Sequence, residues 1–318
     1  MSKEKLKQKA APEQIDNDVI VKIDHLTKDY GKGRGLFDIS LEVKRGTTLG
    51  YCGTNGAGKT TTLRHIMGFL KPDSGTVRVY GLDPYKNSEV IMKKIGYLPG
   101  EIAFPPVENG SQFLKIQAEL TNNTDMSKAE RIINMMQLDP TANLKRMSKG
   151  MKQKTAIVAA FMNSPELIIL DEPTTGLDPL MREAFVSLIK EEKARGATII
   201  MSNHMFDELE ETCDQVAFIR EGKIVDIVDL HEIHNRPFRE YKIGFYDKED
   251  FESADTSQVE VLAKKDKDLQ YIVRVPLEKT DGMFRELKKH QIRYISEVQY
   301  TLEKYFMEHV VGGNENGK

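Results

Sequence analysis

A glycine-rich stretch near residue 55 has the residue types and spacing of a phosphate-binding loop. Gly53, Gly58, Lys59 and Thr60 occupy the fixed places of the pattern G-x-x-x-x-G-K-[ST]. Glycines let backbone N–H groups curl around phosphate oxygens, and a helix that starts behind the loop adds free N–H donors. The lysine is expected to pair with the β- and γ-phosphates, and the threonine hydroxyl to bind Mg²⁺. The stretch therefore predicts a nucleoside triphosphate site with these contacting residues: Gly53, Asn55, Gly56, Ala57, Gly58, Lys59, Thr60 and Thr61.

Two adjacent acids, Asp171 and Glu172, follow the apolar run 167–170. Such a run predicts a central strand covered on both faces, and two carboxylates at its end should face a site because burying them in a core is costly. In open α/β sheets this strand end borders the ligand crevice. We expect Asp171 to hold Mg²⁺ through water and Glu172 to position or deprotonate the attacking water. The alternative is a pair of helix-capping acids before Pro173.

Two further residues are candidates for nucleotide contact. Residues 197–202 repeat the strand pattern and lead to His204, which we expect to reach the γ-phosphate. A histidine at a helix start is often only a cap or a surface residue, which is the alternative. Tyr30 lies in a loop upstream of the phosphate-binding loop, and its ring is expected to stack on the base. The alternative is a tyrosine that packs on its own loop.

The strands that must position these residues alternate with helical segments. A strand over 47–52 precedes the phosphate-binding loop, and a helix over 61–67 follows it. Residues 100–165 are mainly helical and are interpreted as an insertion into an α/β unit. After residue 231 the expected elements are strands over 241–245, 270–275 and 292–298 and a helix over 278–291. The predicted domains are a disordered lead-in over 1–18, an α/β nucleotide-binding domain over 19–230 and a small α+β accessory domain over 231–318.

Two local patterns give expectations about helices. Ser127 and Glu130 fit a capping box at a helix start. In the helix expected after His204, the periodicity separates apolar from acidic residues. The inward-facing residues are expected to be Phe206, Leu209 and Cys213, and the outward-facing ones Asp207, Glu208, Glu210 and Glu211.

The composition is that of an ordinary folded protein and limits the function classes. Of the 318 residues, 39% are hydrophobic and 30% are charged, and this length allows two domains. The formal net charge of −3 gives no electrostatic reason to expect nucleic acid binding. No apolar run approaches the ~18 residues of a membrane span, so any membrane role is expected to go through a partner. Two cysteines in apolar settings do not suggest a disulfide framework and indicate a reducing cytosol.

Taken together, residues 19–228 resemble the ATP-binding cassette (ABC) ATPases, whose fold is a P-loop NTPase sheet with an inserted helical subdomain. Residues 147–153 stand at the family's Leu-Ser-Gly-Gly-Gln signature, and residues 176–179 at the loop after the acids. In this resemblance His204 is the switch histidine and Tyr30 the adenine-stacking aromatic. The resemblance implies a head-to-tail homodimer that sandwiches ATP. The residues implied to contact the nucleotide of the second copy are Ser148, Gly150 and Asp178.

The signature segment also has a physical reason to bind an anion. Residues 148–150 stand at the start of a helix expected over 151–162, where free N–H groups and the helix dipole favour negative charge. Lys59 and the first helix already account for the phosphates bound by the same chain, so a second copy is expected to supply the anion. A plain helix cap and turn is the alternative.

The chain departs from the family pattern at two places. The signature is Ser-Lys-Gly with Met151 in place of glutamine, and Gly100 and Glu101 stand where a loop glutamine is expected. Both changes are similar to the bacitracin/daunorubicin group of drug-exporter ATPases, as is the short C-terminal domain. A carboxylate near phosphates and the acids 171–172 would be repelled. We therefore expect Glu101 to face the outer surface of the helical block and to meet a basic group on a membrane partner.

The resemblance implies an ATPase that uses ATP and Mg²⁺. It would be the cytosolic ATP-binding subunit of an ABC exporter, held at the cytoplasmic face of the membrane by a separate transmembrane permease that it powers. A soluble ABC ATPase acting on ribosomes or DNA is the alternative, although translation-type members usually carry two cassettes and repair-type members a long coiled coil. A module that senses ATP without hydrolysing it is disfavoured because Glu172 is present.

Overall fold

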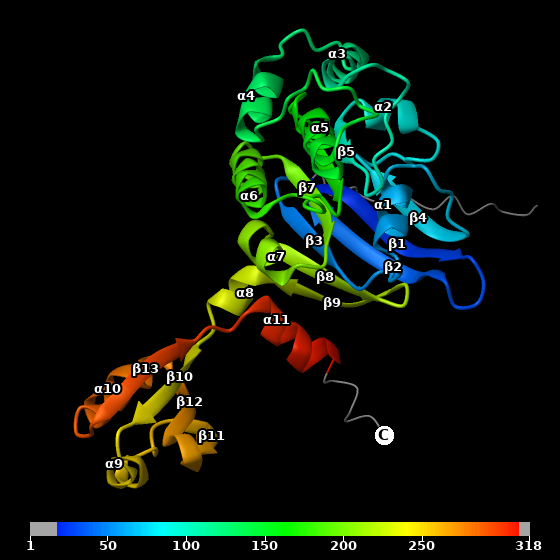
Figure 1. Ribbon diagram of the computed structural model, residues 1–318. Helices are drawn as coiled ribbons and strands as arrows, with labels where there is room; N and C mark the ends of the chain where they lie inside the picture. The colour runs from blue at the N-terminus through cyan, green and yellow to red at the C-terminus, as the bar shows by residue number, and fades with distance from the viewer. Residues whose placement is uncertain (1–17, 312–318) are drawn as a thin grey trace, which may run out of the picture. The chain divides into compact units, whose positions relative to one another are not determined.

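The computed structural model describes residues 18–311, and the chain divides into two compact units (Figure 1). The first unit ends at Ile227 and the second begins at Val228. All of the predicted lead-in except Asp18 lies outside the described residues. The assignment of nucleotide binding to residues 19–230 and of an accessory role to residues 231–318 stays a prediction.

A six-stranded sheet in the order β5-β6-β7-β3-β8-β9 supports the first unit (Figure 1). The pairs β5–β6, β6–β7, β7–β3 and β3–β8 are all parallel. Every residue of β3, β6 and β7 is buried, which explains why their sequences are nearly continuous apolar runs. The strands are β3 Thr48–Cys52, β5 Ile95–Leu98, β6 Leu167–Asp171, β7 Thr198–Asn203, β8 Gln215–Arg220 and β9 Lys223–Asp229.

A second, antiparallel sheet of this unit has the order β2-β1-β4. Its strands are β1 Val19–Asp29, β2 Gly35–Lys44 and β4 Ser74–Val79. Helix α1 (Lys59–Ile66) contacts β2 and β4 on this side and β6 of the larger sheet on the other. Leu63 of α1 belongs to a single buried cluster with Leu36 and Ile169. Each such buried aliphatic side chain contributes about 1.5–3 kcal/mol, so the start of α1 is held firmly in place.

The predicted helical insertion is present in the first unit. Figure 1 shows α3 and α4 grouped with α5, and α5 contacts α3, α4 and strand β5. The α/β sheet, this insertion and the C-terminal α+β unit together confirm the predicted fold class. The helices of the first unit not yet given are α2 Ser88–Met92, α3 Gly110–Leu120, α4 Ser127–Met135, α5 Lys149–Phe161, α6 Pro179–Ala194 and α7 Phe206–Thr212.

Two local predictions for these helices are wrong. Ser127 does not cap α4, because the helix already includes it and Asp125 Oδ1 accepts its N–H at 2.9 Å instead. Glu208 of α7 does not face outward: its side chain is buried and accepts hydrogen bonds from Thr174 and Asn203. The first error arises because an acid two residues earlier competes for the N–H of Ser127, and the second because Thr174 and Asn203, from other segments, supply the partners of Glu208.

The second unit is a four-stranded antiparallel sheet in the order β11-β12-β10-β13 with short helices. Aromatic residues dominate its core, in which Phe245, Phe251 and Tyr271 contact one another. Its predicted helix is shorter than expected, because 3₁₀ turn η2 (Leu277–Lys279) precedes α10. The other elements are α8 Leu230–His234, β10 Phe238–Phe245, α9 Lys248–Ser253, β11 Glu260–Lys265, η1 Asp266–Asp268, β12 Gln270–Pro276, α10 Thr280–Leu287, β13 Ile292–Val298, α11 Leu302–Tyr305 and the π-helix η3 Phe306–Val311.

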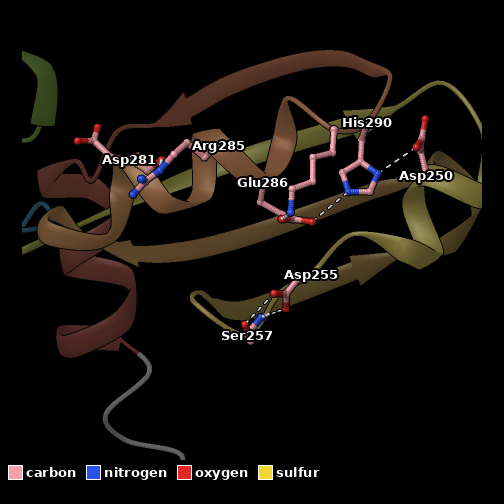
Figure 2. A network of polar contacts seen from close by, with 8 residues as sticks. Asp250, Asp255, Ser257, Asp281, Arg285, Glu286 and His290 are labelled. Carbon is pink, nitrogen blue, oxygen red and sulfur yellow. Dashed lines mark hydrogen bonds and ion pairs between the residues drawn. The ribbon is translucent and has the colours of Figure 1, made fainter.

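A histidine whose side chain is only 8% exposed links two helices of the second unit (Figure 2). His290 lies between two carboxylates, with Nδ1 2.9 Å from Asp250 Oδ1 and Nε2 3.3 Å from Glu286 Oε1. The other oxygen of Asp250 accepts the backbone N–H of Gln291 at 2.8 Å. These contacts join α9, which carries Asp250, to the end of α10 and the turn before β13.

Candidate nucleotide-binding site

A cleft of about 460 Å³ lies where the phosphate-binding loop meets the carboxyl ends of the parallel strands. It brings together Lys59 and Thr60 from α1, Asp171 and Glu172 from the end of β6, and Tyr30 from the loop between β1 and β2. The strand order explains this, because β6 and β3 flank β7 and their carboxyl ends share one edge. The other lining residues are Arg34, Gly35, Thr54, Asn55, Gly56, Gly58, Thr61, Arg64, Tyr97, Pro99, Gly100 and Glu101.

Contacts to its own backbone carbonyls hold the loop in shape. The ammonium of Lys59, buried at 5% exposure, donates to the carbonyl oxygens of Gly53 at 2.7 Å and Thr54 at 3.3 Å. A Cβ on Gly53 would lie 2.4 Å from the carbonyl oxygen of Ile219, so only glycine fits there. Ala57 is buried and accepts the N–H of Gly222 at 2.9 Å. Gly53 and Ala57 therefore shape the loop and do not line the cleft.

Thr60 and Asp171 form one oxygen-rich corner of the cleft. The Thr60 hydroxyl donates to Asp171 Oδ2 at 2.7 Å, and the Ser202 hydroxyl donates to Asp171 Oδ1 at 2.6 Å. These are hard oxygen donors beside the phosphate-binding loop, and Mg²⁺ is usually held by one or two such groups together with phosphate oxygens and water. Among residues 18–311 no cluster of three His, Cys, Asp or Glu side chains is suited to a metal. The oxygens of Thr60 and Asp171 fit one or two ligand positions of Mg²⁺, whose remaining positions phosphate oxygens and water would fill.

Glu172 has an unusual backbone conformation at the end of β6. Its φ is +49°, in the left-handed region that few non-glycine residues adopt, which turns the chain sharply after Asp171. Its N–H donates to Ser202 Oγ at 3.0 Å and to the Ser202 carbonyl at 3.2 Å. The side chain keeps contact with solvent, and Oε1 lies 3.6 Å from Nζ of Lys59. The carboxylate thus faces the cleft beside Lys59.

Tyr30 belongs to a closed turn at the cleft entrance. Its N–H donates to the Arg34 carbonyl at 2.8 Å, and the N–H of Arg34 donates to the Gly31 carbonyl at 3.2 Å. Tyr30 is 48% exposed, with the ammonium of Lys28 5.9 Å from the centre of its ring, and its exposed side chain can meet a base. Arg34 and Arg64 also line the cleft, and the sequence reasoning did not include them. Their nearness to Tyr30 in the loop, and to Thr60 one helical turn away, was the signal that could have identified them.

The prediction that Glu101 faces the outer surface of the helical block is wrong, because Glu101 lines the cleft. Strands β5 and β6 are parallel neighbours with Leu98 opposite Leu170, so the chain after Leu98 runs beside Asp171. A Cβ on Gly100 would lie 3.1 Å from Asp171 Oδ2, closer than most side chains can approach. The backbone therefore passes tightly beside Asp171 and brings the next residue to the cleft.

Several residues implied by the resemblance lie outside the lining of this cleft. Within the part of the chain that the structure describes, Ser148, Gly150, Asp178 and His204 are not among the lining residues. Ser148 caps α5 by accepting the N–H of Met151 at 3.2 Å, and Asp178 caps α6 by accepting the N–H of Met181 at 3.0 Å. Both caps are exposed, as is His204, so all three remain accessible to a second molecule.

The groups around the site differ in their electrostatic setting. Burial raises the pKa of the Cys52 thiol, one residue before the loop, to about 11, although Lys59 opposes the shift. Burial, with a smaller contribution from Asp171, also raises the pKa of Tyr97. Both groups are therefore uncharged at neutral pH, and the charges in the cleft come from its lysine, arginines and carboxylates.

No helix between residues 18 and 311 is long and apolar enough to cross a membrane.

Comparison with known proteins gives a consistent result. The family model described as "ABC transporter" matches residues 36–175. The bacitracin transport ATP-binding protein BcrA of Bacillus licheniformis is 34% identical over 237 residues, which cover 72% of this chain and 76% of that protein. A solved ATP-binding subunit of an ABC transporter superposes with a TM-score of 0.62 at 30% identity, over 68% of this chain and 92% of that one. A dimeric ATP-binding cassette bound to ADP and Pi in a post-hydrolysis state has the same fold, with a TM-score of 0.59 at 24% identity over 66% and 98% of the two chains.

Proposed function

Because the chain belongs to the ATP-binding proteins of ABC transporters and is an ATPase of that family, we propose that two copies hydrolyse Mg²⁺–ATP between them to power a separate membrane-spanning subunit. The single observation that carries this proposal is the convergence of Lys59, Thr60, Asp171 and Glu172 on one cleft. We place the chain at the cytoplasmic face of the membrane, where the membrane-spanning partner holds it.

Each residue of the cleft has a defined task in this proposal. The ammonium of Lys59 leaves the loop carbonyls to which it donates and binds the β- and γ-phosphates. Tyr30 stacks on the base. Thr60 and Asp171 would hold Mg²⁺, which when bound neutralises charge on the phosphate oxygens. Glu172 accepts a proton from the water that attacks the γ-phosphate, and its turn keeps the carboxylate pointing at the cleft. His204 is assigned to the γ-phosphate from a neighbouring turn.

The second copy completes the site. Ser148 and Gly150 stand at the exposed start of α5, where the first N–H groups and the helix dipole favour an anion. Gly150 packs closely on the carbonyl oxygen of Gly176, two residues before Asp178, so the signature turn and the loop after the acids form one surface. We assign this surface to the ATP held by the partner copy. The dimeric state of a cassette with the same fold supports this assignment.

A separate groove of about 860 Å³ offers a place for the membrane-spanning partner. Apolar side chains from α2, α3 and α5 line much of it, among them Met92, Phe113 and the 65% exposed Leu120. Tyr97 and Pro99 line both this groove and the nucleotide cleft. We assign the groove to a largely apolar helix of the partner, because a segment shared by both spaces lets the partner sense the nucleotide. The export direction rests on the resemblance of Gly100 and Met151 to the drug-exporter group.

The proposal is tested first on the isolated protein. Glu172→Gln should lower the kcat for ATP hydrolysis at least about 100-fold, because it removes the base, while the Kd for Mg²⁺–ATP stays within about threefold. Gel filtration with ATP should then show a trapped dimer. Glu183→Gln, an exposed acid of α6, is the matched control and should behave as wild type. Turnover of Glu172→Gln near the wild-type rate would contradict the assignment of the base.

The partner is tested on membranes. Tagged full-length chain is expected to co-purify with a multi-span membrane protein, whereas co-purification with ribosomes would support the soluble alternative. Leu120→Glu should abolish that co-purification and leave basal hydrolysis unchanged, because it places a charge in the groove. Val225→Glu, which introduces the same charge at an exposed apolar residue of β9 outside the groove, serves as the control. Retention of the partner by Leu120→Glu would contradict the groove assignment.

A further inference from the structure

A buried carboxylate of α7 connects the two turns that carry the proposed catalytic side chains. Glu208 is only 9% exposed, and its Oε2 accepts two hydrogen bonds, from Thr174 Oγ1 at 2.7 Å and from Asn203 Nδ2 at 2.6 Å. Both donors are themselves buried, at 4% and 2% exposure. One oxygen atom therefore joins two segments that are about 30 residues apart in the sequence.

The two donors stand next to functional residues. Thr174 follows Glu172 by two positions, in a turn closed by the bond from the Thr175 N–H to the Glu172 carbonyl at 3.2 Å. Asn203 directly precedes His204, and its Oδ1 accepts the N–H of His204 at 2.7 Å. Fixing Thr174 and Asn203 on one carboxylate therefore fixes the turn of the base relative to the turn of the histidine.

The same turn is also held from the opposite helix. Gln153 of α5 is buried and donates from Nε2 to the carbonyl of Pro173 at 2.6 Å, between Glu172 and Thr174. Hydrogen bonds from Gln153 of α5 and to Glu208 of α7 thus hold the turn after β6 from two helices. Both buried contacts restrain the backbone of the turn that carries Glu172.

Burial of the Glu208 carboxylate lowers the stability of the fold, so its presence calls for a role in positioning. Glu208 Oε1 is buried and has no hydrogen-bond partner among the described residues. A buried carboxylate with one unsatisfied oxygen costs stability, and an apolar side chain of similar volume would pack there without that cost. What an apolar side chain cannot supply is one acceptor shared by two donors. The geometry is explained if the fold keeps this carboxylate to set distances in the site.

We propose that Glu208 is a positioning residue for ATP hydrolysis, which holds Glu172 and His204 in the mutual arrangement that the reaction needs. Among the described residues it is not one that lines the nucleotide cleft, and it acts through Thr174 and Asn203. The inference rests on the proposed roles of Glu172 and His204 and extends them to the carboxylate behind both.

The unpartnered oxygen makes a sharp pair of variants possible. Glu208→Gln can keep its amide oxygen on both donors and place its NH₂ group at the unpartnered position, so it retains the bridge. Glu208→Ala removes the bridge altogether. Glu211→Ala, an exposed acid of the same helix paired with Lys190, is the control. Thr174→Val, which removes one donor with little change of volume, gives the same test without a large cavity.

The measurements are kcat, the Kd for Mg²⁺–ATP and the melting temperature of each full-length variant. Glu208→Ala should lower kcat about 10- to 100-fold and Glu208→Gln less than about threefold, with every Kd within about threefold of wild type. Thr174→Val should fall between them, and Glu211→Ala should match wild type. A kcat of Glu208→Ala equal to wild type, a Glu208→Gln as slow as Glu208→Ala, or a parallel loss of ATP affinity would each overturn the positioning role.

Combination with His204→Ala tests whether Glu208 acts through the histidine. If it does, the double variant Glu208→Ala/His204→Ala should lose less activity than the product of the two single losses, because both changes disturb one unit. Independent, multiplicative losses would overturn the proposal. The two levels of inference remain separable: normal turnover by both Glu172→Gln and His204→Ala would refute the proposed site, whereas normal turnover by Glu208→Ala alone would refute only this inference.

Discussion

The ammonium of Lys59 lies 3.6 Å from Oε1 of Glu172, so the proposed phosphate ligand and the proposed base form an ion pair. The same ammonium donates to the carbonyls of Gly53 and Thr54, which leaves it well satisfied before any nucleotide binds. Phosphate oxygens must compete with these contacts. The pairing also keeps the charge of the base balanced within the cleft until the lysine is drawn to the phosphates.

Replacement of Lys59 should therefore affect binding more directly than folding. Lys59→Ala removes a buried, charged donor to the phosphates, and hydrogen bonds of that kind contribute about 1.5–3 kcal/mol. The Kd for Mg²⁺–ATP should rise about 10- to 100-fold, measured by titration calorimetry or with a fluorescent ATP analogue. Lys115→Ala, an exposed lysine of α3, is the control. Unchanged ATP affinity in Lys59→Ala would contradict its assignment to the phosphates.

The sequence was sufficient to predict the corner formed by Thr60 and Asp171. A glycine loop after one buried strand and an acid at the end of another lie at the same edge of a sheet when both strands are parallel members of it. The strand order, in which only β7 separates β3 from β6, then brings the two groups into contact. The fold class was predictable for the same reason, since continuous apolar runs and helical periodicity are local properties of the chain.

The position of Glu208 could not be obtained in that way. Its helix places acids at four of the five positions from 207 to 211, and polarity alone puts all of them on the outside. The donors that make burial possible come from Thr174 and Asn203, which belong to other segments. The sequence mispredicts the position of Glu101 for a related reason: charge repulsion favours a place away from the acids, but the path of the backbone beside Asp171 depends on strand pairing.

The corrected position of Glu101 leads to a prediction about charge. Its carboxylate lines a cleft that is expected to hold the phosphates of ATP, and two like charges at 4 Å repel by about 1 kcal/mol even in water. Glu101→Gln should therefore tighten ATP binding up to about fivefold at low salt, and less in 0.5 M NaCl, where screening is stronger. Glu119→Gln on α3 is the control. Weaker Mg²⁺–ATP binding in Glu101→Gln would show instead that this carboxylate helps to hold the metal.

The contacts around His290 in the second unit predict a dependence of stability on pH (Figure 2). The N–H of Gln291, and then His290, lower the pKa of Asp250, and Lys289, followed by His290, lowers that of Glu286. Carboxyls whose pKa is lower in the folded state stabilise the fold above their unfolded values and lose that contribution as the pH falls through the folded ones. With unfolded values near 4, the contribution should be complete above about pH 5 and decline below about pH 4.

Thermal melting of the full chain between pH 7 and pH 3 measures this effect. Asp250→Asn should melt at a lower temperature than wild type at pH 7, and its melting temperature should fall less steeply on acidification. Glu278→Gln replaces an exposed carboxyl of the same unit and should follow the wild-type curve. Parallel curves for Asp250→Asn and wild type would mean that this carboxyl does not carry the acid sensitivity.

The proposed composite site makes the most specific prediction, because in that proposal Ser148 and Lys59 of one chain serve different nucleotides. Ser148 is exposed and outside the cleft that Lys59 lines, so a homodimer of Ser148→Arg has two intact phosphate-binding loops and two damaged signature turns. A homodimer of Lys59→Ala has the reverse, and both should be inactive. A mixed dimer pairs the sound loop of one chain with the sound signature turn of the other and gains one complete site.

Random mixing of equal amounts should therefore recover about a quarter of wild-type ATPase activity, if the two sites hydrolyse independently. The measurement is ATP hydrolysis against mixing ratio, with heterodimers counted through two different affinity tags. If heterodimers form but activity stays at the level of the parents, Ser148 and Lys59 act on the same nucleotide within one chain, and the sandwich arrangement is wrong.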